Sequence, residues 1–117
     1  MTHDALTIEG IDTAGALKRL GNKRERYEAL LRKFAEKQSG SVVTVRTALA
    51  AGDRATAERE LHSLRGAAGS LGVIAIAETA GECEHALREG GDVESSLKTL
   101  EKSLAASVAA IRSTLPD

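Results

Sequence analysis

The 117-residue chain is long enough for one domain with one hydrophobic core. Hydrophobic residues make up 42% of it but aromatic residues only 2%, and there is a single proline, which is typical of closely packed helices. The net charge of −1 gives no global field that would select nucleic acid or an anionic membrane, the single cysteine excludes an internal disulfide, and no apolar stretch approaches the ~20 residues that span a bilayer.

The first half of the chain predicts a short helix followed by a longer, interrupted one. Asp12 is placed to cap the short helix, which closes at Gly21. Asn22 followed by Glu25 resembles a capping box and predicts the start of the second helix. Residues 39–41 (Ser-Gly-Ser) interrupt its apolar pattern, so this helix is either broken or kinked there.

Three further helices follow from stop and cap signals. Gly52 and Asp53 end one helix and cap the next, and Gly90 and Asp92 do the same further on. The apolar residues between these signals recur every three or four positions: Ala57, Leu61, Leu64, Ala68 and Leu71; Ile76, Ala80, Cys83 and Leu87; Val93, Leu97, Leu100, Leu104, Val108, Ile111 and Leu115. We therefore expect Cys83 to be a small buried core residue.

The pattern predicts an all-α fold, because no stretch alternates with period two over the length of a strand. Short connectors between helices of similar length favour antiparallel neighbours. We expect an up-and-down antiparallel four-helix bundle with an additional short N-terminal helix. Residues 11–117 would form this single domain, and residues 1–10 a flexible leader.

One stripe of the third predicted helix combines a histidine, a cation and bare backbone. At about 100° per residue, Arg65, Gly66 and Gly69 lie within about 60° of His62, and the core stripe centres about 140° away. Each interior glycine costs about 1 kcal/mol relative to alanine, so two of them indicate a surface kept open for another protein. Neutral imidazole is a nucleophile near pH 7, and a guanidinium matches phosphate oxygens. The stripe predicts a docking and phosphoryl-transfer site.

These residues also carry a family resemblance. The segment from Asp53 to Gly91 resembles a histidine-containing phosphotransfer (HPt) domain of bacterial phosphorelays. The family motif, His-x-x-Lys/Arg-Gly-Ala/Ser followed by Leu-Gly, stands here as His62-Ser63-Leu64-Arg65-Gly66-Ala67-Ala68 and then Leu71-Gly72. Glu84 falls where the family often has glutamate.

The resemblance implies that His62 is phosphorylated, that Arg65 is the cation beside the phosphate, and that Gly66 allows a partner to approach closely. We expect the partner surface to include Ala55, Glu58, Gly69 and, at its edge, Glu84. The protein would accept a phosphoryl group from a receiver-domain aspartate and pass it to the aspartate of another response regulator. It would have no autokinase activity, because the sequence contains no nucleotide-binding motif.

The expected partners are receiver domains of response regulators or of a hybrid kinase, with no nucleic acid and no membrane contact by this domain. It would bind no cofactor itself, and Mg²⁺ would sit on the partner receiver domain. We expect a cytoplasmic location, either alone or on the cytoplasmic side of a membrane-bound hybrid kinase. A free-standing protein and the C-terminal domain of a hybrid sensor kinase look alike at this level.

Two other functions compete with phosphotransfer. A helical adaptor without chemistry explains the periodicity equally well, but not the outward stripe. The second alternative is a metal-binding four-helix bundle enzyme, because the Glu82-x-x-His85 spacing is one that di-iron bundles use. Only one copy is present, and both side chains are expected to point away from the core, so a solvated helix face is favoured. The basic run from Lys18 to Lys33 is interleaved with glutamates, which favours a solvated surface over a nucleic-acid site.

Overall fold

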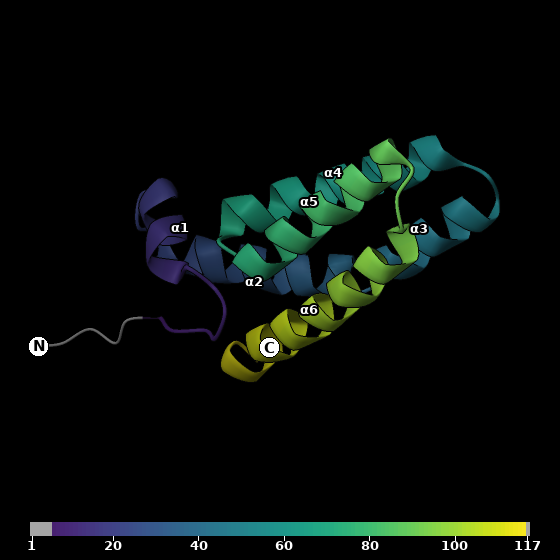
Figure 1. Ribbon diagram of the computed structural model, residues 1–117. Coiled ribbons are helices and arrows are strands. Elements are labelled where there is room, and N and C mark those ends of the chain that lie inside the picture. The colour runs from purple at the N-terminus through teal and green to yellow at the C-terminus, as the bar shows by residue number, and fades with distance from the viewer. Residues whose placement is uncertain (1–5, 117) are drawn as a thin grey trace, which may run out of the picture.

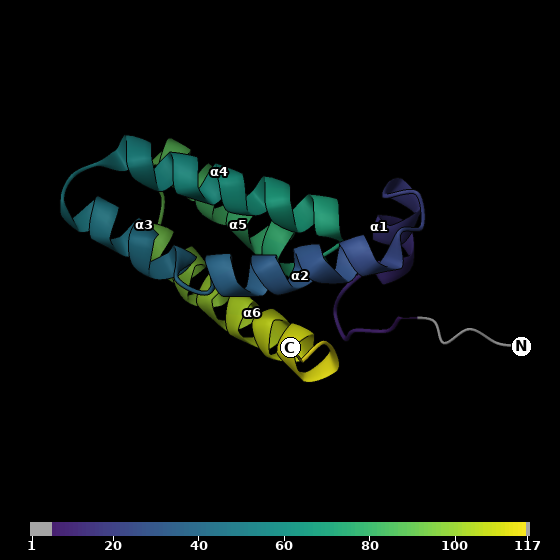
Figure 2. The same ribbon diagram turned by 180° about the vertical axis from the view of Figure 1, so that it is seen from behind.

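In the computed structural model, which describes residues 6–116, the chain forms a bundle of antiparallel helical arms (Figures 1 and 2). Among these residues the helices are α1 (Thr13–Arg19), α2 (Arg24–Gln38), α3 (Ser41–Ala50), α4 (Arg54–Leu71), α5 (Ile74–Glu89) and α6 (Val93–Thr114). The predicted all-α bundle with a short N-terminal helix is confirmed, with α2 and α3 together forming one arm. No helix in this part of the chain is both long and apolar enough to cross a membrane.

Three helix N-caps lie where the sequence predicts them. Asp12, Asp53 and Asp92 each accept a hydrogen bond from the backbone N–H three residues further on, at 3.0, 3.1 and 3.1 Å. These bonds satisfy N–H groups that the first turn of a helix leaves without a partner. Helices α3 and α5 end next to the predicted stops, Gly52 and Gly90.

The predicted start of α2 at Asn22 is wrong. Asn22 has a left-handed φ of 61°, and its N–H donates to the carbonyl of Leu17 at 2.8 Å. The residue therefore closes α1, and this conformation is incompatible with the extended backbone of an N-cap. Lys23 caps α2 instead, without a side-chain hydrogen bond.

The interruption at residues 39–41 is a kink that separates two helices without reversing the chain. Ser39 keeps helical dihedral angles (φ −58°, ψ −25°), whereas Gly40 leaves the helical range (φ −98°, ψ 6°) without adopting a positive φ. Helices α2 and α3 consequently continue in the same general direction along the bundle (Figure 1).

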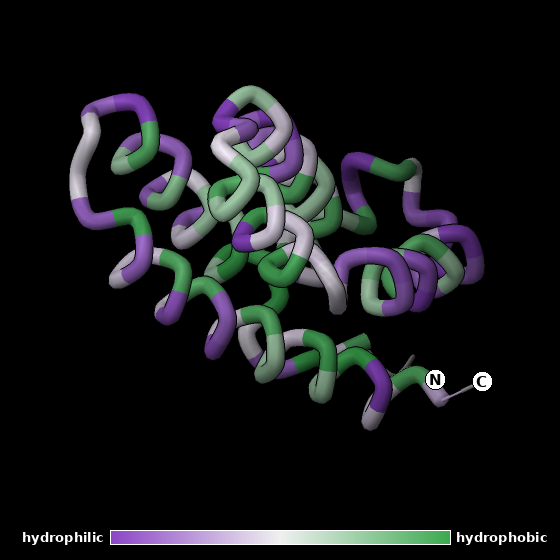
Figure 3. Tube along the Cα trace, turned by 90° about the vertical axis from the view of Figure 1, so that its right-hand side faces the viewer, coloured by the Kyte–Doolittle hydropathy of each residue, from purple (hydrophilic) through white to green (hydrophobic). Residues whose placement is uncertain are grey.

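The core is formed by the apolar stripes predicted for the later helices. Ala57, Leu61, Leu64 and Ala68 of α4 are completely buried, and the hydrophobic parts of the helices face the middle of the bundle in the end-on view (Figure 3). Cys83 is also buried, as predicted, and burial raises the pKa of its thiol to about 11. One face of α4 is thus fixed inside, which leaves the opposite face outside.

The C-terminal end of α4 is tied to the N-terminal part of the chain. The hydroxyl of Tyr27 donates to the carbonyl of Leu71 at 2.6 Å, and the N–H of Asp12 donates to the carbonyl of Gly72 at 2.8 Å. Gly72 has a φ of 79°, and a Cβ there would collide with the Asp12 carbonyl oxygen, so this position requires glycine. Burial, with a smaller effect of Asp12, raises the pKa of Tyr27 to about 12.

The expectation of a flexible leader over residues 1–10 is wrong for residues 6–10, and residues 1–5 lie outside the described residues. Leu6 and Ile8 are 7% and 2% exposed, and the hydroxyl of Thr13 donates to the Leu6 carbonyl at 2.5 Å. The segment packs as extended chain and turn, so its apolar residues have no helical spacing. A prediction based on helical spacing therefore did not assign it to the core. The domain begins at least five residues earlier than predicted.

Replacing Ile8 by alanine tests this correction. Because the side chain is 2% exposed, we expect Ile8→Ala to lower the free energy of unfolding by about 2–4 kcal/mol, measured by urea denaturation. The matched control is Ile74→Ala, where the side chain is 49% exposed and the expected loss is below about 1 kcal/mol. Equal losses at both positions would contradict the packing of residues 6–10.

Candidate functional site

His62 lies on the outward face of α4. Its side chain is 71% exposed, whereas its neighbours Leu61 and Leu64 are completely buried. The ring is therefore reachable from solvent while the helix that carries it is held by the core, as the wheel position predicts.

The surface next to His62 is bare backbone. Apart from its chain neighbours and the nearby backbone of α4 itself, a Cβ added at Gly66 or at Gly69 would meet no atom within 4 Å. Ala55, at the other end of the same face, is exposed and contributes only a methyl group. The face therefore offers little side-chain bulk to keep another protein at a distance.

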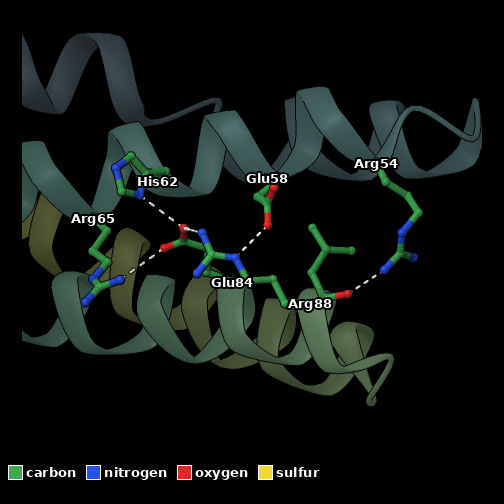
Figure 4. Close-up of polar contacts among 7 residues, drawn as sticks. Arg54, Glu58, His62, Arg65, Glu84 and Arg88 are labelled. Carbon is green, nitrogen blue, oxygen red and sulfur yellow. Dashed lines mark hydrogen bonds and ion pairs between the residues drawn. The ribbon is translucent and has the colours of Figure 1, made fainter.

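Glu84 of α5 lies buried beneath the exposed histidine (Figure 4). Its side chain is only 1% exposed, yet it meets three groups that carry N–H donors. His62 Nδ1 is 3.1 Å from Oε2, Arg88 Nη2 is 2.8 Å from the same oxygen, and Arg65 Nη1 is 3.2 Å from Oε1. Burial raises the pKa of Glu84, but the hydrogen bonds of His62 and Arg65 and the charge of Arg88 outweigh it, so the net shift is downward.

This contact decides which ring nitrogen of His62 is free. An ionised carboxylate can only accept hydrogen bonds, so the nitrogen that faces Glu84 has to carry a hydrogen. In the neutral ring Nδ1 is then the N–H, and Nε2 keeps its lone pair. The geometry thus leaves the free lone pair of His62 on Nε2, the ring nitrogen that does not face Glu84.

Arg88 links the two helices beside the histidine. Its Nε donates to Glu58 of α4 at 2.7 Å, while its Nη2 donates to Glu84 at 2.8 Å. One helical turn further along, the guanidinium of Arg54 donates to the carbonyl of Leu87 (Figure 4). These contacts hold α4 and α5 in register at the site.

The structure brings together most of the residues predicted for the site. His62, Arg65, Gly66, Gly69 and Ala55 are exposed on α4, and Glu58 is 40% exposed while paired with Arg88. The expectation that Glu84 contacts a partner at the edge of the surface is wrong, because Glu84 is buried under two of these side chains.

Sequence reasoning missed Arg88. The signal was its position four residues after Glu84, where side chains on one helix meet. The spacing alone favours a contact between Arg88 and Glu84. It does not indicate that this contact belongs to the site, which depends on the burial of Glu84 beneath His62.

The metal-site alternative finds no geometric support within residues 6–116, where no group of three or more His, Cys, Asp or Glu side chains is placed to hold an ion. Glu82 and His85 are both exposed on α5.

The chain matches a known protein family. A family model described as Hpt domain matches residues 29–114, about three quarters of the chain. Comparisons with curated proteins and with solved structures gave no match.

Substitution of Glu84 tests the buried ion network. We expect Glu84→Gln to lower the free energy of unfolding at pH 7 by about 1–3 kcal/mol, because the donors lose a charged acceptor. The pKa of Glu84 lies below its ordinary value of 4.5, so the ionised group favours the folded state above that pH, and this advantage disappears as the pH falls through the lower folded value.

Urea denaturation at pH 7 and at about pH 3 measures this dependence. The difference in free energy of unfolding between the wild type and Glu84→Gln should be smaller at the lower pH. Glu78→Gln, at an exposed position of the same helix, is the control and should change little. A difference for Glu84→Gln that persists undiminished at the acid pH would contradict the role of its charge.

Proposed function

This chain belongs to the Hpt domain family of two-component phosphorelays, and on that premise we propose that His62 is the residue that carries the phosphoryl group. The proposal rests on one observation: an exposed imidazole whose Nδ1 faces a buried carboxylate, which leaves Nε2 free to react. A helical adaptor without chemistry would not need this arrangement.

The phosphoryl group comes from the aspartyl phosphate of a receiver domain. The lone pair of His62 Nε2 attacks phosphorus, the N–P bond forms as the P–O bond breaks, and the aspartate carboxylate leaves with the electron pair. The ring keeps its Nδ1 hydrogen and acquires a positive charge. Glu84, at 3.1 Å, is already in place to stabilise that charge. The reverse reaction with the aspartate of another response regulator completes the relay.

Arg65 is the second group assigned to the phosphoryl site. Its side chain is 54% exposed and lies three residues from His62, within side-chain reach on one helix face. A planar guanidinium can donate two parallel hydrogen bonds to phosphoryl oxygens. In the unphosphorylated protein the same guanidinium is held by Glu84.

The partner supplies the remaining chemistry. In this proposal the domain binds no cofactor and has no autokinase activity, and the Mg²⁺ that assists transfer is held by the receiver domain of a response regulator or of a hybrid kinase. Transfer then depends on alignment of the two proteins. Gly66, Gly69 and Ala55 form the surface that permits this approach. We place the reaction in the cytoplasm, where the proposed partners act.

Replacing His62 by glutamine tests the acceptor. We expect His62→Gln to take no ³²P label from receiver domains phosphorylated with acetyl phosphate. Because the His62 side chain is 71% exposed, the free energy of unfolding of the variant should stay within about 1 kcal/mol of the wild-type value. His85→Gln, at an exposed position of α5, is the control and should be labelled normally. A labelled His62→Gln protein would end this assignment.

Replacing Gly66 by leucine tests the bare surface. The side chain has room in the free domain, so we expect the fold to persist while transfer from receiver domains slows by about tenfold or more, since small misalignments cost large factors in rate. Labelling by phosphoramidate, a small donor, should stay near the wild-type rate. Gly40→Leu, between α2 and α3, is the control. Unchanged receiver transfer in Gly66→Leu would refute close approach at this position.

A further inference from the structure

Glu84 has more partners than its proposed role with His62 requires. Its two carboxylate oxygens are shared by Arg65 on one side and by Arg88 and His62 on the other (Figure 4). At 1% exposure the side chain has almost no access to water. A partner that leaves is therefore not simply replaced by solvent.

The proposed function places conflicting demands on Arg65. Before phosphorylation its guanidinium is bonded to Glu84 at 3.2 Å, and after phosphorylation it is needed at the phosphoryl oxygens on Nε2. Removing the partner of a buried charge is strongly unfavourable. If Arg65 were the only cation on Glu84, this penalty would oppose phosphorylation.

Arg88 is a second cation on the same carboxylate. It lies on the opposite side of Glu84 from Arg65 (Figure 4) and bonds Oε2 at 2.8 Å. Its Nε is bonded to Glu58 at 2.7 Å, so α4 also fixes the guanidinium. Arg88 can remain on Glu84 without reaching the phosphoryl group.

We propose that Arg88 is a positioning residue for phosphotransfer, which keeps the charge of Glu84 paired so that Arg65 can move to the phosphoryl group. This inference rests on the proposed function. As the Nε2–P bond forms, Arg65 exchanges a carboxylate oxygen for a phosphoryl oxygen. Glu84 stays bonded to Arg88 and to the Nδ1 hydrogen of His62, and no proton is transferred. Glu58 contributes by orienting Arg88.

A double-mutant cycle between positions 84 and 88 tests this inference in the full chain. Labelling rates are measured with two donors, phosphoramidate and receiver domains phosphorylated with acetyl phosphate. We expect Arg88→Gln to slow both reactions about tenfold. In a Glu84→Gln background, where no buried charge needs a cation, the same change should have an effect of less than about twofold.

Two further variants separate positioning from other roles. Arg88→Lys keeps the charge and should recover most of the wild-type rate. Arg59→Gln removes the same charge from a neighbouring exposed position of α4 and should leave both rates unchanged. Urea denaturation is used to check that each variant is folded at the assay temperature.

Each of the alternative outcomes would contradict a specific part of the proposal. Equal slowing by Arg88→Gln in both backgrounds would show that Arg88 does not act through Glu84. Slowing with receiver domains alone would make Arg88 a docking residue instead. An unchanged Arg88→Gln rate overturns this inference while the proposed function stands. A wild-type protein that takes no label from either donor overturns both.

Discussion

The site depends on a negative charge that is buried beneath an exposed imidazole. Glu84 is 1% exposed and His62 is 71% exposed, although the two side chains are in direct contact. A carboxylate in this position is stable only because several donors surround it, and the donors come from both α4 and α5. The packing of these two helices therefore sets the orientation of the histidine, its tautomer and the positions of the two arginines.

The rest of the bundle serves to keep α4 in one place. Its inner stripe is completely buried, its C-terminal end is bonded to Tyr27 and to Asp12, and its N-terminal end is joined to α5 through Arg54. With these constraints the outward face has little freedom to move. A partner can then dock on a preorganised surface, which reduces the entropy lost on association.

The proposed docking face is made of residues that do little for stability. Gly66 and Gly69 each forgo the helix propensity of alanine, at about 1 kcal/mol per position. The Glu58–Arg88 pair has both side chains at least 40% exposed, so in isolation it contributes little. Stability comes from the opposite face of α4, and this separation allows the outer face to be shaped for a partner.

The sequence by itself determined the helices, their caps at Asp12, Asp53 and Asp92, and the outward stripe with His62, because these features depend on neighbours within a few positions along the chain. Only the tertiary structure showed that Glu84 is buried beneath His62, that Arg88 shares its carboxylate, and that Leu6 and Ile8 belong to the core. His62 and Glu84 are 22 positions apart in the sequence, so their contact depends on how α4 and α5 pack, which no local pattern specifies. Arg88 lies only four positions from Glu84, but its importance follows from the burial of Glu84, which the same packing decides. Residues 6–10 have no helical period from which their packing could be predicted.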